Sequence, residues 1–238
     1  MISYQLIFIN DEFIVINKPA GLIVHGAEHI TEPSLTDEIV KEYPEVAKVG
    51  DDPERPGLMH RLDKLASGLM VIARTQDSFD NLKKQFQKRE VEKIYTALVY
   101  GKIPQDDGEI NFPIDRSAKG FKMAALPLTK DGESNDEGRR AISNFSVIKR
   151  FINYTLLNVK IKTGRTHQIR VHMAAYGYPL VGDDLYGTGK TKIKNKKLAL
   201  TRIYLVASEL SFKDLASKKQ HFQIDLPEEF NNLLKSIK

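Results

Sequence analysis

The apolar residues of this chain gather into short runs that end at turn-forming residues, and this pattern limits the folds available to it. Residues 6–9 and 13–16 are two such runs with polar residues between them, which predicts a β-hairpin. Residues 69–73 form a continuous apolar run of a length typical of a buried strand. No run approaches the roughly 20 residues that cross a bilayer, so we expect no membrane segment.

Apolar residues at helical spacing predict several helices among these strands. Ser34 is expected to cap one helix and Thr166 another, because a side-chain oxygen in that position accepts a backbone N–H of the first turn. Strands and helices follow one another without regular alternation, which favours an α+β fold over a doubly wound sheet. The other elements are predicted at residues 77–89 (helix), 94–99 (strand), 141–162 (two strands) and 227–237 (helix).

Two polar stretches, residues 118–140 and 187–197, are expected to be exposed loops. The second carries a run of lysines that includes Lys190, Lys192 and Lys194. These lysines could neutralise nucleic-acid phosphates, or they could simply keep a loop solvated. No linker divides the chain cleanly, so a single domain over residues 1–238 is expected.

Composition excludes several chemistries and leaves others open. The chain has no cysteine, which excludes disulfides, thiolate zinc sites and a cysteine nucleophile, and which fits a cytoplasmic protein. A net charge of +5 permits a polyanionic partner without requiring one. The end of a phosphate-binding loop is suggested by Gly189-Lys190-Thr191, but Asp184 occupies a position where that motif needs glycine. The histidines are not spaced as a metal-binding set, so we expect neither metal nor cofactor.

One charged polar segment lies shortly before a glycine and an apolar run that is predicted to be a strand. His60-Arg61-Leu62-Asp63 is followed within a few residues by Gly68 and the apolar run, which is how a strand edge can present a carboxylate. Taken alone, this segment could equally be a surface turn with an ion pair.

This segment resembles the catalytic motif of the RluA-type pseudouridine synthases, in which His-Arg-Leu-Asp precedes a small polar residue, glycine and an apolar strand. The resemblance implies an α+β pseudouridine synthase fold, with a mixed, mostly antiparallel central sheet and flanking helices around a catalytic cleft. Departures occur at Ala66 and at residues 205–207 and 213–214, and the small RNA-binding domain found ahead of the catalytic domain in many relatives is expected to be absent. Further matching blocks, in the family's order, are residues 17–25, 93–95, 138–141, 164–173 and 182–187.

The resemblance also implies roles for individual residues. It makes Asp63 the catalytic carboxylate, Tyr95 a stacking platform that could assist proton removal from the base, and Arg170 the cation that keeps Asp63 ionised. Without it, Tyr95 could be a half-buried strand tyrosine and Arg170 an exposed helix arginine. The residues expected to contact substrate or RNA are Arg61, His60, Ile169, Leu205, Arg165, Lys190, Lys192 and Lys194.

The implied reaction converts uridine to pseudouridine in a structured RNA without a redox step. Asp63 could attack the sugar covalently or assist formation of a glycal, and the sequence does not decide between these routes. Two alternatives remain: a catalytically silent RNA-binding protein on the same scaffold, and an N-glycosidase that releases uracil. The expected partner is ribosomal or transfer RNA, with a monomeric protein, no obligate protein partner and no membrane.

Overall fold

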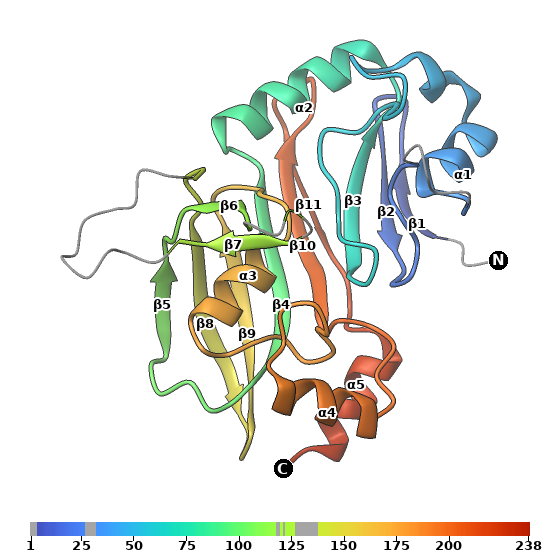
Figure 1. The fold of residues 1–238 in the computed structure, drawn as a ribbon. Helices are drawn as coiled ribbons and strands as arrows, with labels where there is room; N and C mark the ends of the chain where they lie inside the picture. The colour runs from blue at the N-terminus through green and yellow to red at the C-terminus, as the bar shows by residue number, and fades with distance from the viewer. Residues whose placement is uncertain (1–3, 27–31, 118–119, 121, 127–137) are drawn as a thin grey trace. The chain divides into compact units, whose positions relative to one another are not determined.

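The computed structural model describes residues 4–26, 32–117, 120, 122–126 and 138–238. These residues form two compact units, each built from strands and helices (Figure 1). The first unit comprises Met1–Lys93 and Val206–Asp225, and the second comprises Ile94–Leu205 and Leu226–Lys238. The α+β prediction is therefore confirmed, while the expectation of a single domain stays a prediction.

The first unit is built around a hairpin extended by further strands. β2 pairs antiparallel with both β1 and β3, and β10 adds to β3 in parallel and to β11 antiparallel. Phe13, Val71, Leu82 and Phe212 belong to its apolar core, and α2 packs against β3. Its elements are β1 (Gln5–Ile9), β2 (Phe13–Lys18), α1 (Leu35–Glu42), the 3₁₀-helix η1 (Pro44–Lys48), β3 (Ser67–Ala73), α2 (Gln76–Lys88), β10 (Leu205–Lys213, its first residue assigned to the second unit) and β11 (Lys219–Gln223).

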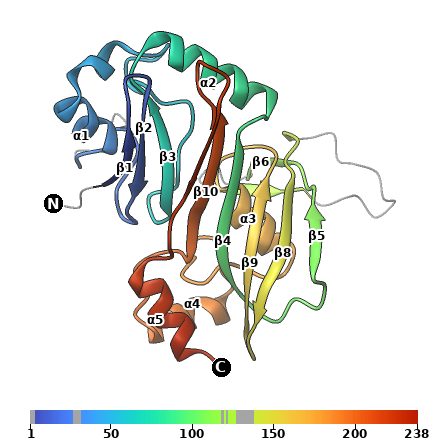
Figure 2. The same cartoon turned by 180° about the vertical axis from the view of Figure 1, so that it is seen from behind.

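In the second unit, β4, β9, β8 and β5 lie side by side in that order, all antiparallel. α3 lies on one face of these strands (Figure 2). It contacts β8 and also β7, which pairs with β6 in a separate two-stranded sheet. The elements are β4 (Glu92–Tyr100, beginning in the first unit), β5 (Asp107–Ile110), β6 (Ile114–Arg116), β7 (Met123–Ala125), β8 (Ser143–Arg150), β9 (Tyr154–Ile161), α3 (Gln168–Ala175), α4 (Gly189–Lys197) and α5 (Glu228–Ser236). No helix in the described part of the chain is long and apolar enough to cross a membrane.

Local side-chain chemistry explains why several predicted elements form. In the hairpin, the Asn10 carboxamide oxygen accepts the backbone N–H groups of Glu12 and Phe13 at 3.0 and 2.8 Å, which fixes the turn between β1 and β2. Ser34 and Asp37 form a reciprocal capping box at the start of α1. The predicted hairpin and the helix after Ser34 are therefore confirmed.

Two expectations about polar stretches are wrong. Residues 189–197 form a helix rather than a loop, because Thr188 caps it, lysine is a good helix former and the buried Thr191 and Asn195 anchor one face. Within residues 118–140, Met123–Ala125 pairs with β6 as a strand. Residues 118–119, 121 and 127–137 of that expected loop lie outside the described residues.

Thr166 is not the cap of α3, which is the third correction. The residue before the helix is His167, whose backbone is left-handed with φ 56° and whose side chain does not cap. Gln168 instead holds the turn before the helix, because its carboxamide oxygen accepts the Arg165 N–H at 3.1 Å and the Thr163 hydroxyl at 2.7 Å. A side chain inside the helix thus fixes the turn that precedes it.

Gly68 gives a test of the packing between β3 and β10. A Cβ at this position would lie 2.4 Å from the Ala207 nitrogen and 2.5 Å from its oxygen, on a backbone with φ +124°. We expect Gly68→Ala to lower the free energy of unfolding by more than about 3 kcal/mol, measured by urea denaturation. Gly189→Ala is the control, since a Cβ there meets nothing within 4 Å, and it should change stability by less than about 1 kcal/mol. Equal stabilities of the two variants would contradict this account of the strand pair.

Candidate active site

Asp63, Arg61 and His60 lie together on the loop that leads into β3 in the first unit. The Ala66 N–H donates to the Asp63 backbone oxygen at 3.1 Å, so a tight turn follows the carboxylate directly. Asp63 is half-buried and Arg61 is exposed. The loop therefore presents a carboxylate that is held by its backbone yet partly accessible.

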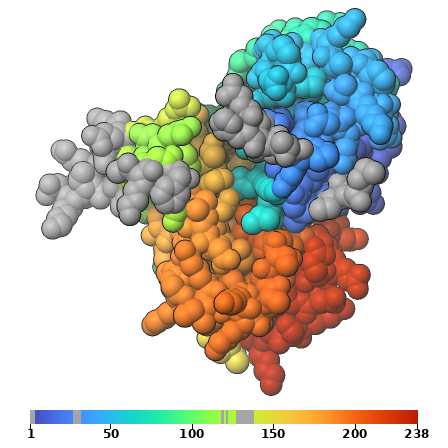
Figure 3. All heavy atoms as spheres, turned by 45° about the vertical axis from the view of Figure 1, so that its right-hand side comes forward, coloured from blue at the N-terminus to red at the C-terminus, as the bar shows by residue number. Residues whose placement is uncertain are grey.

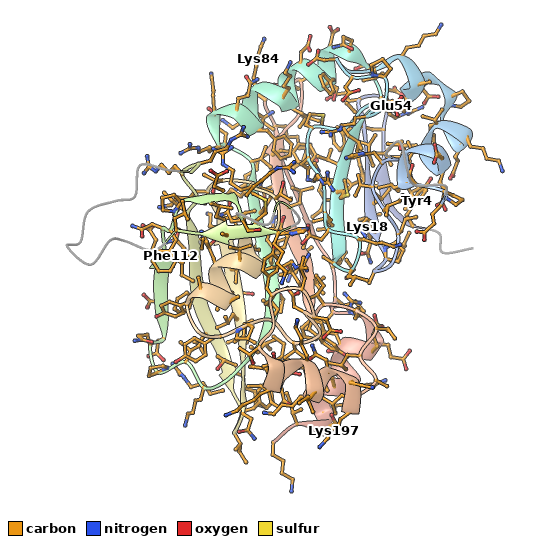
Figure 4. All side chains as sticks on the ribbon, viewed as in Figure 1. Tyr4, Lys18, Glu54, Lys84, Phe112 and Lys197 are labelled. Atoms are coloured by element: carbon orange, nitrogen blue, oxygen red, sulfur yellow. The ribbon has the colours of Figure 1, made fainter. Side chains whose placement is uncertain are left out.

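A buried lysine holds this loop against its neighbour. Lys18, labelled in Figure 4, lies at the end of β2. Its side chain is fully buried, with 0% exposed. Its ammonium donates to the backbone oxygens of Pro19 and Leu22 at 2.8 Å each and of Lys64 at 3.3 Å, and the Gly21 N–H donates to the same Lys64 oxygen at 2.7 Å. Removing a charge from water is costly unless hydrogen bonds replace the solvent, and these carbonyls supply them. In the sequence Lys18 is one residue of the matching block 17–25; the signal that distinguishes it is a charged residue at the end of an apolar strand.

Arg61 has a protein partner but remains on the surface. One of its terminal nitrogens lies 3.2 Å from His25 Nε2. The pKa of His25 is lowered, first by burial and then by the positive charge of Arg61. A neutral His25 can accept a hydrogen bond from Arg61, which orients an exposed guanidinium.

His60 has a structural role in the first unit. Its Nε2 accepts the Val71 N–H at 3.1 Å, and its ring stacks on Phe86 with centroids 4.9 Å apart. Burial and then the charge of Lys93 lower the pKa of His60 to about 3. A neutral imidazole therefore completes a hydrogen bond of β3, and Nε2 is already occupied, which argues against the expected RNA contact through that atom.

In the second unit, Arg170 of α3 is buried, 7% exposed, rather than an exposed helix arginine. Its Nε and one terminal nitrogen donate to the two carboxylate oxygens of Asp183 at 2.7 and 3.0 Å. Asp183 is 1% exposed and also accepts the N–H groups of Leu185 and Tyr186 at 3.0 and 3.1 Å. This two-point contact fixes the plane of the guanidinium. Asp183 is a residue that sequence reasoning missed, although it lies in a matching block.

An aromatic ring covers the same guanidinium. The Tyr186 ring centroid lies 5.1 Å from the central guanidinium carbon of Arg170, within cation–π range. The Tyr186 hydroxyl accepts the Met123 N–H at 3.0 Å and lies 2.8 Å from His167 Nδ1. Asp183 and Tyr186 together leave Arg170 little freedom to reorient.

The remaining predicted pocket residues of the second unit are buried. Tyr95 on β4, Ile169 on α3 and Leu205 at the start of β10 are 7%, 5% and 4% exposed. Tyr95 lies in register with Val159 of β9. Such side chains suit a site from which water is excluded.

A hydrogen-bond network anchors α3 to β8. The Gln168 carboxamide nitrogen donates to the Ile142 oxygen at 3.0 Å and to the Ser143 hydroxyl at 3.1 Å. His172 Nδ1 lies 2.9 Å from the same hydroxyl. Arg165, half-exposed just before the helix, donates from Nε to the Arg140 oxygen at 3.2 Å. The helix that carries Ile169 and Arg170 is therefore fixed by polar contacts.

The predicted RNA-binding lysines lie on α4, in the orange part of the chain that Figure 3 shows at the surface. Lys190, Lys192 and Lys194 are all exposed. Among the described residues, no group of three His, Asp or Glu side chains is placed to hold a metal ion.

Comparisons with known proteins agree with the sequence resemblance. Residues 12–175 match the family described as RNA pseudouridylate synthase. The chain is 36% identical over 237 residues to a protein of Aquifex aeolicus named as an uncharacterized RNA pseudouridine synthase, covering 98% of this chain and 72% of that one. It is 41% identical over 187 residues to ribosomal large subunit pseudouridine synthase D of Pseudomonas aeruginosa, covering 78% of this chain and 54% of the relative. The chain thus spans about half the length of this second relative.

A solved structure shares the fold. Human RNA pseudouridylate synthase domain containing 4 is 25% identical, with a TM-score of 0.78 over 98% of this chain and 94% of that one. The fold implied by the resemblance is confirmed by this similarity.

The low pKa of His60 gives a testable pH dependence. In the unfolded chain this histidine protonates near its ordinary pKa of about 6.5, whereas in the folded protein it stays neutral until about pH 3. The stability that neutral His60 contributes is therefore lost as pH falls from about 6.5 towards 3. Between pH 7 and 5 we expect wild type to lose about 1–2 kcal/mol more unfolding free energy than His60→Gln, measured by urea denaturation. Identical losses in both proteins would show that His60 is not held neutral.

Proposed function

Because this chain belongs to the RNA pseudouridylate synthase family, as an isomerase of the RluA type, we propose that it converts specific uridines of a structured RNA to pseudouridine with Asp63 as its catalytic carboxylate. The observation that carries this proposal is the Asp63 loop, clamped through Lys18 while the carboxylate stays partly accessible. Preorganised charge of this kind stabilises a transition state without reorganisation during the reaction.

The reaction begins with extrusion of the target uridine from its stack, which costs a few kcal/mol. The exposed Arg61 offsets this cost by binding the RNA while the base is turned out. The carboxylate of Asp63 then acts at the ribose, and the C–N glycosidic bond breaks. Both the covalent and the glycal route require ionised Asp63, and the proposal assigns to Arg170 the role of favouring that form.

The detached uracil must rotate before its C5 bonds to the sugar. Tyr95 supplies a flat π-face for this intermediate and a hydroxyl that assists removal of the C5 proton. Ile169 and Leu205 are apolar and buried, which suits lining that keeps water from hydrolysing the intermediate. No step exchanges electrons, so the proposed chemistry is complete with the chain's own side chains.

The proposed partner is RNA, bound through Arg165 and the lysines of α4 in addition to Arg61. The Pseudomonas aeruginosa relative is named for the ribosomal large subunit, so ribosomal RNA is the first substrate to test, with transfer RNA as the alternative. A cytoplasmic location and a monomeric state fit this proposal.

Asp63→Ala tests the central assignment. We expect the variant to bind RNA as wild type does while its rate of pseudouridine formation falls at least about 10³-fold, because the group that acts at the sugar is gone. Chromatography of nucleosides from digested RNA measures the product. Asp11→Ala, at an exposed turn, is the control and should retain wild-type activity.

The same chromatography separates the alternatives. If the protein only binds RNA and is catalytically silent, neither the wild type nor Asp63→Ala forms pseudouridine. An N-glycosidase would release free uracil and leave abasic RNA. Undiminished pseudouridine formation by Asp63→Ala would remove Asp63 from the mechanism.

A further inference from the structure

Helix α4 has a buried inner side that contacts a turn near Arg170. Asn195 is 2% exposed, and its carboxamide oxygen accepts the Tyr100 hydroxyl at 2.6 Å and the Gly182 N–H at 3.0 Å. Its carboxamide nitrogen donates to the Asp184 carboxylate at 2.8 Å. Asn195 therefore bonds to the residues on both sides of Asp183.

The turn that Asn195 holds has little room to shift. Gly182 has φ +81°, and a Cβ there would lie 1.9 Å from the Arg202 backbone oxygen. Asp183 follows directly and makes the two-point contact with Arg170. A displacement of this turn would move the carboxylate that orients the guanidinium.

The outer side of α4 is cationic. Because an α-helix has about 3.6 residues per turn, Lys190, Lys194 and Lys197 share one row and Lys192 and Lys196 a second, on either side of the buried Thr191–Asn195 row. Ile193, 60% exposed, lies between the two lysine rows. Within the described part of the chain, none of these lysines forms an ion pair (Figure 4 labels Lys197).

Part of this charge pattern is unfavourable for the helix itself, although the lysines of its last turn suit the helix dipole. Lysines four residues apart repel each other, and Lys190 lies in the first turn, where the helix dipole disfavours a cation. No acidic residue within α4 offsets this repulsion. A polyanion bound along the outer side would relieve it, since each phosphate neutralised releases counterions.

We infer that α4 has two roles, one on each side. Its outer lysine rows dock the sugar-phosphate backbone of the substrate RNA. On its inner side, Asn195 is a positioning residue that holds the Gly182–Asp184 turn and, through Asp183, the guanidinium of Arg170. The inference rests on the proposed function. It separates two roles on one short helix, affinity on the outside and catalytic geometry on the inside.

A donor–acceptor exchange tests the inner side. Asn195→Asp keeps an oxygen for Tyr100 and Gly182 but sets two carboxylates against each other at Asp184. We expect kcat for pseudouridine formation to fall at least about 10-fold while the Kd for RNA stays within about 2-fold of wild type. Asn195→Asp combined with Asp184→Asn restores a donor facing an acceptor, and kcat should return to within about 3-fold of wild type.

Stability alone cannot produce this pattern. Thermal unfolding identifies variants that are not folded at the assay temperature. If Asn195→Asp is not folded, Asn195→Ser is used in its place, because it adds no charge, and we expect the same loss of kcat. Folded single variants with wild-type kcat, or a double variant that recovers nothing, would overturn the role of Asn195. If wild type makes no pseudouridine, the proposed function fails and this inference fails with it.

The outer side is tested by charge removal. Lys190, Lys192, Lys196 and Lys197 are replaced together by serine; Lys194 is kept because its ammonium lies 5.6 Å from the Tyr100 ring centroid. We expect weaker RNA binding and a slope of log Kd against log salt that is shallower by about 1–3. Replacing Lys41, Lys48, Lys84 and Lys88 by serine changes the net charge equally, in exposed positions of the first unit, and should leave the slope at its wild-type value. Equal slopes for the two quadruple variants would overturn the docking role.

Discussion

The buried ion pair of Arg170 and Asp183 is the interaction on which the second unit's share of the proposed chemistry depends. Side-chain exposures of 8% and 0% mean that both charges have lost their hydration, which is tolerable only because their hydrogen bonds replace it. Asp183 accepts from Arg170 and from two backbone N–H groups, so the carboxylate is fixed before any substrate arrives. A cation held in this way can favour an ionised carboxylate without reorganising.

The first unit uses the same physical device with a different residue. Lys18 places a buried ammonium among backbone carbonyls and so joins the loop after β2 to the loop that carries Asp63. Neither Lys18 nor Asp183 is proposed to touch the substrate. Each fixes a backbone or side chain that is proposed to do so, which explains why charged residues occur in apolar surroundings in both units.

Sequence patterns predicted the elements whose local signals agree with the tertiary structure. The turn at Asn10 and the capping box at Ser34 are formed by neighbours in the chain, so they could be read without coordinates. α4 was missed because its lysine-rich sequence has no apolar stripe; a buried carboxamide and threonine anchor it instead. Thr166 was misassigned because the left-handed backbone of His167 is set by Gln168 and its partners.

In the candidate site too, the sequence predicts some features, while others depend on tertiary contacts. Family motifs supplied the positions of Asp63, Tyr95 and Arg170, because motif order is a property of the sequence. The partners of Arg170 and of His60 could not be inferred, since Asp183 and Val71 reach them only through folding. Burial of Arg170 likewise depends on the packing around α3, so spacing alone left it as an ordinary surface arginine.

The most direct measurement of the central claim is the single-turnover rate and RNA affinity of Asp183→Asn. A neutral carboxamide keeps the size of Asp183 but loses the charge that orients Arg170. The rate of pseudouridine formation should fall at least about 10-fold with RNA affinity unchanged. Asp106→Asn, which alters the surface ion pair with Arg150, should match wild type. A folded Asp183→Asn protein that reacts at the wild-type rate would contradict the claim that the chemistry needs Arg170 to be held in a fixed orientation.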